Sequence, residues 1–114
     1  DMLEDELNSV DAVLNHIEKV EIKEGIFDEH VIQKDLIRAY FDLELALASL
    51  CILLRKMSEN LFIHIDEDIR RDINSIIHSN KFEYHDHDRI YVYSQKGKEP
   101  VDLNNLLRFA RSIL

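Results

Sequence analysis

Residues 43–54 read LELALASLCILL, and this run decides the expected fold. In a helix formed by these residues, apolar side chains occupy almost every face, which is typical of a helix surrounded by other elements. The small side chains of Ala46, Ala48 and Ser49 let a neighbouring helix approach closely. We therefore expect a central helix here, which is also a candidate seam for a dimer.

Apolar residues in alternating steps of four and three positions extend this helix in both directions. The stripe consists of Leu36, Tyr40, Leu43, Leu47, Leu50, Leu54, Met57 and Leu61. The same spacing predicts an earlier helix from Leu3, Leu7, Val10, Leu14 and Ile17. Gly25 is the expected end of that earlier helix, with a short connector after it.

The remainder of the chain predicts two short helices with a hairpin between them. Acidic residues at 66–68 favour a helix start because of the helix dipole, and isoleucines 69, 73, 76 and 77 form its apolar stripe. Residues 82–93 alternate in the manner of two strands, and we expect the hairpin to end at the sequence KGKEP, 96–100. Asp102 is the expected N-cap of a last helix that runs to the C-terminus.

The composition agrees with a mainly helical domain. Two Gly and one Pro in 114 residues are few, and helices seldom need either residue. A chain of this length suits a single domain spanning 1–114. The predicted fold class is therefore all-α: a four-to-five-helix up-and-down bundle with a small β-hairpin before the last helix.

Charge and cysteine content limit the possible settings. The formal net charge of −9 argues against a protein that coats DNA or RNA through broad electrostatics. Cys51 is the single cysteine, so no internal disulfide forms, which favours a reducing, cytoplasmic setting. We expect no membrane partner, because the apolar run at 46–54 is about half the length that spans a bilayer. Asp1 and an apolar C-terminal pattern leave open that the chain is a piece of a longer protein.

Arg71 and His78 carry the candidate chemistry. Positions i and i+7 of a helix lie about 20° apart around the axis and about 10.5 Å apart along it, so these two residues share a face with Asn74 and Ser75. Imidazole acts as acid or base near neutral pH, and a guanidinium stabilises a phosphate in its transition state. Those groups cleave RNA without a metal. A single phosphate does not span the separation within one chain, so this chemistry requires a dimer.

The segments INSIIHSNKFEY and DRIYVYSQKGKEPVDLNNLLRFARSIL resemble the second half of HEPN (higher eukaryote and prokaryote nucleotide-binding) domains. The resemblance implies a homodimeric helical domain of a toxin–antitoxin, abortive-infection or CRISPR-type defence system. It also implies a metal-independent endoribonuclease with His78 as base or acid, Arg71 as phosphate-binding cation and Asn74 as a positioning group. A further implication is a partner, a nucleotidyltransferase-type antitoxin. No cofactor or metal is expected.

The sequence departs from the family pattern at one position. The commonest HEPN motif has its Arg five residues before the His, where this chain has Ile73. Either Arg71 supplies the cation, or the site has lost it. The alternative function is therefore a non-catalytic helical module for dimerisation and protein interaction. Arg and His side chains on the outer face of a helix are also often merely solvated.

Two other patterns have simpler explanations. Residues 85–88 read HDHD, in which two His two positions apart on a strand share a face beside two carboxylates. A polar hairpin tip is the more economical explanation, since no clear third ligand is present. Tyr84, Tyr91 and Tyr93 are able to stack on bases, although packing is expected for at least two of the three. Cys51 is expected to be buried.

Overall fold

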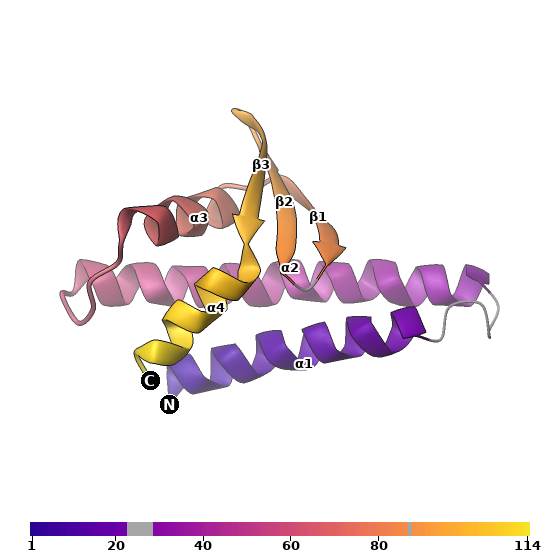
Figure 1. Ribbon diagram of the computed structural model, residues 1–114, viewed down its shortest axis with the longest axis horizontal. Helices are drawn as coiled ribbons and strands as arrows, with labels where there is room; N and C mark the ends of the chain where they lie inside the picture. Colours follow the sequence, from indigo (N-terminus) through magenta and orange to yellow (C-terminus); the bar gives the residue numbers. More distant parts are fainter. Residues whose placement is uncertain (23–28, 87) are drawn as a thin grey trace.

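The computed structural model describes residues 1–22, 29–86 and 88–114 (Figure 1). Over these residues the helices are α1 (Met2–Ile22), α2 (Glu29–Glu59), α3 (Glu67–Ile77) and α4 (Leu103–Ser112), and the strands are β1 (Lys81–Asp86), β2 (Arg89–Ser94) and β3 (Gly97–Asp102). The predicted helix end at Gly25 lies outside the described residues.

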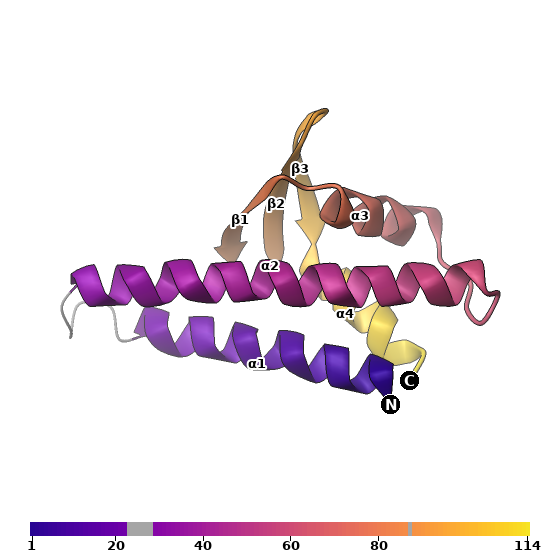
Figure 2. The ribbon, with the colours of Figure 1, turned by 180° about the vertical axis from the view of Figure 1, so that it is seen from behind.

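α1 and α2 run side by side in opposite directions and form the long axis of the molecule (Figure 1). Their predicted stripes meet in one core, where Val10, Ile17, Leu43, Leu50 and Leu54 are fully buried. α3 and the sheet lie along the other side of α2, and both views show this arrangement (Figure 2). The helices predicted from the apolar spacing are thus confirmed, and α2 begins earlier than its stripe indicates.

The predicted extension of this stripe to Leu61 is wrong. α2 ends at Glu59, and the Leu61 side chain is 90% exposed. Leu61 has a φ of 62°, and its N–H donates to the Ser58 carbonyl while the N–H of Phe62 donates to that of Met57. These two bonds form a helix-ending motif that usually places Gly at the left-handed position. The apolar spacing continues to Leu61 although the helix ends at Glu59, so spacing alone predicted too long a helix.

The predicted all-α bundle is also wrong. The part of the chain that the structure describes contains a three-stranded antiparallel sheet in the order β1-β2-β3, so the fold is mixed α/β and dominated by helices. α3 and α4 are short and pack on the sheet as well as on α2 and α1, which an up-and-down bundle does not provide for. The predicted hairpin is present as β1 and β2, and β3 is the addition.

β3 was missed because the sequence there contains Gly97 and Pro100, which usually interrupt strands. Gly97 has a φ of 113° and belongs to the tight turn between β2 and β3. At this turn Ser94 pairs with Gly97, and Tyr93 pairs with Lys98. Pro100 lies opposite Tyr91 on β3, which is an edge strand of the sheet. An edge strand tolerates proline because one side of its backbone needs no ladder hydrogen bond.

The sheet rests on the helices through its inner face. Ile90, Val92 and Val101 point inward and are buried together with the apolar side of α4. The Asp102 side chain accepts a hydrogen bond from the Asn105 N–H, which confirms Asp102 as the N-cap of α4. The Cα atoms extend over 49 × 33 × 17 Å, so the molecule is a thin slab.

One face of α2 lacks the neighbours that the sequence predicted on all sides. Ile37, Phe41, Leu45 and Ile52 have exposed fractions of 68%, 59%, 55% and 37%. In Figure 2, α2 lies in front of α3, α4 and the sheet, with α1 beside it and no other element over it. The slab therefore presents an apolar stripe, defined by these four residues, on one broad face.

Candidate functional site

α3 is held in place by its apolar side and presents its polar side to solvent. Ile69, Ile73 and Ile76 are buried in the core. Glu67 and Asp68 lie in the first turn, where the helix dipole favours negative charge. The burial pattern of α3 thus fixes which of its side chains are available for chemistry.

His78 ends α3, as the sequence predicted. It is the C-cap residue: its backbone N–H donates to the Asn74 carbonyl, and the N–H of Ser79 donates to the Ile76 carbonyl. Arg71, Asn74 and His78 are all exposed.

Beside α3 lies a groove of about 710 Å³, which we call the α3 groove. From α3 and its C-cap it is lined by Glu67, Arg70, Arg71, Asn74, Ser75 and His78. From the opposite side it is lined by Asn80 and by the β2–β3 turn region with Ser94, Gln95, Lys96 and Glu99. The structure therefore brings the three predicted residues Arg71, Asn74 and His78 together in one cavity.

Two hydrogen bonds hold the walls of the groove together. The Ser75 hydroxyl donates to Glu99 Oε2 at 2.8 Å, which joins the middle of α3 to β3. The Asn80 N–H donates to the Tyr93 carbonyl at 2.7 Å, which joins the segment after His78 to the end of β2. The β2–β3 turn is thereby fixed opposite the C-terminal end of α3.

The charge balance of the groove differs from that of the whole chain. Arg70, Arg71 and Lys96 face two carboxylates, those of Glu67 and Glu99. The Glu99 carboxylate is engaged by Ser75. The α3 groove thus carries more cationic than anionic side chains in a chain of net charge −9, and a local excess of cations attracts anions.

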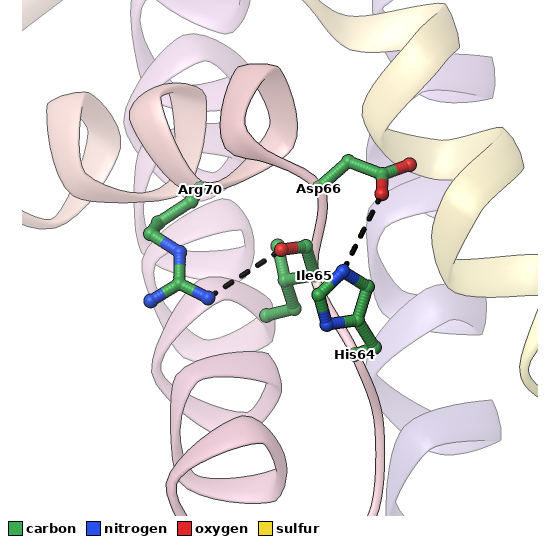
Figure 3. Close-up of polar contacts among 4 residues, drawn as sticks. All are labelled: His64, Ile65, Asp66 and Arg70. Atoms are coloured by element: carbon green, nitrogen blue, oxygen red, sulfur yellow. Dashed lines mark hydrogen bonds and ion pairs between the residues drawn. The ribbon is translucent and has the colours of Figure 1, made fainter.

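Arg70 is positioned by the segment that leads into α3 (Figure 3). Its Nη2 lies 3.4 Å from the Ile65 carbonyl, to which it donates a hydrogen bond. Next to it, His64 Nε2 lies 3.7 Å from Asp66 Oδ1. Arg70 was not singled out from the sequence, since it lies next to Arg71 and only the spacing to His78 was considered.

Arg71 also lines a second, smaller pocket of about 380 Å³, which we call the acidic pocket. Its carboxylates are those of Asp68, Asp72, Asp88 and Asp102, and Arg89 is its other cation. Burial raises the pKa of Asp72 to about 6, against the opposing effect of Arg71 and with a further rise from Asp102 and Asp68. Arg71 therefore lies between a cavity richer in cations and one richer in anions.

Ile73 lies five residues before His78, where the resemblance to HEPN domains would place an arginine. This side chain is 2% exposed and belongs to the hydrophobic core. A cation at this position would be buried among apolar side chains, at a high cost in free energy. In this chain the cations of the groove come instead from Arg70 and Arg71 on the exposed side of α3 and from Lys96 in the turn.

The other candidate residues separate into two groups. Tyr84 stacks on Tyr40 with ring centroids 5.2 Å apart, so it has a packing role, and burial raises its pKa. Burial, with a contribution from Asp72, raises the pKa of Cys51 to about 12, which keeps this thiol protonated and unreactive. Tyr91 and Tyr93 lie on the opposite face of the sheet from the core.

The residues of the HDHD segment have local partners. The His85 ring meets Tyr91 edge-on at 5.9 Å. Asp86 Oδ1 accepts a hydrogen bond from the Asp88 N–H at 2.8 Å, which shapes the β1–β2 turn, and His87 lies outside the described residues. Within residues 1–22, 29–86 and 88–114, no group of three or more His, Cys, Asp or Glu side chains is arranged to hold a metal ion.

Two further observations concern the chain as a whole. Among the described helices, none combines the length and the apolar character that crossing a membrane requires. Comparisons of the chain with protein-family models, with curated proteins and with solved structures find no match.

Proposed function

We propose that this chain is a HEPN-like domain that cleaves RNA without a metal, and that the α3 groove holds the scissile phosphate. The observation that supports this function is the meeting of Arg71, Asn74 and His78 with Lys96 in one locally cationic cavity. Cations from two different elements of one chain fit a phosphodiester better than a lone exposed arginine does. The setting of such a domain is the cytoplasm.

In this proposal His78 removes the proton from the ribose 2′-hydroxyl. The 2′-oxygen attacks the adjacent phosphorus, and the bond from phosphorus to the 5′-oxygen breaks. The leaving 5′-oxygen receives a proton from the protonated His78 of a second copy, so the products are a 2′,3′-cyclic phosphate and a 5′-hydroxyl. Arg71 stabilises the added negative charge on the phosphorane, and Asn74 orients the phosphate by hydrogen bonding.

The second copy binds at the exposed apolar stripe of α2. Four side chains with full areas on the order of 200 Å² each, about half exposed, supply roughly 400 Å² per copy. A standard interface buries about 800 Å² per partner, so the stripe covers about half and the polar side chains beside it cover the rest. Isolated apolar residues need no explanation, but a stripe of four exposed apolar side chains along about four turns of one helix indicates an interface.

An antiparallel pairing of two α2 helices is compatible with a shared site. α3 runs back along α2, and its C-terminal end lies toward the middle of α2 in both views (Figures 1 and 2). A two-fold axis through the centre of the stripe therefore brings the C-terminal ends of both α3 helices to the same side of the dimer. Because His78 caps α3, this pairing places the His78 residues of both copies on the same side of the dimer.

Such nucleases are held inactive by a partner, and a nucleotidyltransferase-type antitoxin is the proposed one. It would cover the groove and its exposed imidazole. The support for this step is the resemblance of the His78 segment to HEPN domains.

Cleavage of a labelled single-stranded RNA in EDTA tests the proposed function. We expect cleavage by the wild type, with a loss of at least 100-fold for His78→Ala and for Arg71→Ala. His16→Ala and Arg108→Ala are matched controls, because both residues are exposed on other helices. Sedimentation reports the mass of each variant, so loss of activity is separated from loss of the dimer.

A non-catalytic interaction module is the second candidate, and Ile73 in the core is the observation that favours it. In that case the wild type is a stable dimer by sedimentation and leaves the RNA intact. Equal cleavage by all variants would assign any activity to a contaminant and would also reject the proposed nuclease.

A further inference from the structure

The outer face of the sheet, which points away from the core, carries two tyrosines of β2. Side chains alternate across a strand, so Ile90 and Val92 of β2 point to the core while Tyr91 and Tyr93 point outward. Both tyrosines are half-buried, although no helix of the described chain lies over this face (Figure 1). Two aromatic rings two positions apart on the middle strand therefore form an accessible platform.

Basic side chains surround these two rings. Lys98 Nζ lies 4.5 Å from the centroid of the Tyr91 ring and 5.7 Å from that of Tyr93. Lys81, which pairs with Tyr93 from β1, has its Nζ 5.7 Å from the centroid of the Tyr93 ring. Arg89 Nη1 donates to the Tyr91 hydroxyl at 3.5 Å. Lys81 lies on β1, Lys98 lies on β3, and Arg89 lies on β2 together with the tyrosines. The positions of these three cations therefore follow from the register of the sheet.

One acidic residue, Glu83, lies beside the rings. Glu83 Oε2 accepts a hydrogen bond from the Tyr93 hydroxyl at 2.8 Å. This bond, followed by Lys98 and Lys81, lowers the pKa of Glu83. Three cations and one carboxylate therefore surround the rings, in a chain whose net charge is −9.

From this arrangement we infer that the outer face of the sheet binds single-stranded RNA, with bases stacked on Tyr91 and Tyr93. Every base has a π-face, so stacking of this kind tolerates different sequences. Lys98 and Lys81 leave the ring faces when a base arrives and contact the phosphates on either side. The choice of RNA over other single strands rests on the proposed function, whereas the stacking site itself does not.

The platform adjoins the α3 groove at the end of the sheet. Lys81 belongs to the platform, and its neighbour Asn80 lines the groove. Lys98 belongs to the platform, and Lys96 lines the groove across the Gly97 turn. A strand stacked on the tyrosines therefore reaches the groove around one end of the sheet, so the platform presents the substrate to the proposed site.

Fluorescence anisotropy with labelled decauridine in EDTA tests the platform, in the His78→Ala background so that no cleavage intervenes. We expect the Tyr91→Leu/Tyr93→Leu double variant to bind at least tenfold more weakly, and Tyr91→Phe/Tyr93→Phe to stay within about threefold, because the rings remain. Thermal unfolding verifies that both doubles are folded. Equal affinity of a folded leucine double, or no binding by the parent, would overturn the inference.

The two proposals fail separately in this design. If decauridine binding depends on the two rings but the wild type does not cleave RNA, the platform proposal stands and the nuclease proposal is rejected. Cleavage that depends on His78, with decauridine affinity unaffected by removal of the rings, retains the nuclease and rejects the platform.

Discussion

The α3 groove and the acidic pocket are two cavities that share Arg71 and differ in charge. In the groove Arg71 is accompanied by Arg70, Lys96 and the imidazole of His78. In the acidic pocket it faces four aspartates. The difference arises because charged residues of α3 lie on different faces of the helix. Asp72, the residue after Arg71, lines the acidic pocket and not the groove. An anion therefore has one favourable approach to Arg71, through the groove.

Removal of the Ile73 side chain is expected to have the largest effect, because this residue anchors α3 and thereby both cavities. Ile73 is 2% exposed, and Ile73→Ala leaves a cavity in the core. We expect the free energy of unfolding in urea to fall by about 3 kcal/mol. Ile77→Ala is the matched control on the same helix, where the side chain is less buried, and it is expected to cost less. An equal cost for both would show that α3 is not anchored as described.

Neutralising Asp72 is expected to raise the free energy of unfolding, by less than Ile73→Ala lowers it. A raised pKa means that ionised Asp72 destabilises the folded state, so stability is lost as the pH rises from about 4 to about 6. The shift of about two pKa units corresponds to about 3 kcal/mol. Solvent screening of a half-exposed carboxyl reduces this to about 1 kcal/mol.

Asp72→Asn is therefore expected to raise the free energy of unfolding by about 1 kcal/mol at pH 7.5 and to have a smaller effect at pH 4, where the carboxyl is protonated in the folded state. Urea unfolding at the two pH values measures this difference. Asp42→Asn, on the exposed surface of α2, is the matched control. A gain from Asp72→Asn that is the same at both pH values would contradict the role assigned to its ionisation.

The sequence predicted most of what periodicity determines. The helices around Leu43 and Ile73 and the cap at Asp102 follow from apolar spacing and end signals, which are local properties. The shared face of Arg71, Asn74 and His78 follows from helix geometry in the same way. These features required no knowledge of which elements pack together.

What the sequence did not predict depends on contacts between distant segments. Pro100 and Gly97 argue against a strand until β2 is known to lie beside them. Lys96 becomes part of the groove only because Asn80 pairs with Tyr93 and because Glu99 bonds to Ser75. The sequence predicted a helix surrounded by partners and left a dimer seam as a possibility, since an apolar face has the same sequence whether its partner is in the chain or outside it.

The central claim is that an RNA phosphate enters the α3 groove and avoids the acidic pocket. NMR titration of the 15N-labelled wild type with 2′-O-methyl oligouridine in EDTA tests it directly, because the blocked 2′-oxygen prevents cleavage. The account predicts larger amide shifts at Asn74, His78 and Lys96 than at Asp88 and Asn105, which line the acidic pocket. Larger shifts at the acidic pocket, with the groove residues unchanged, would contradict it.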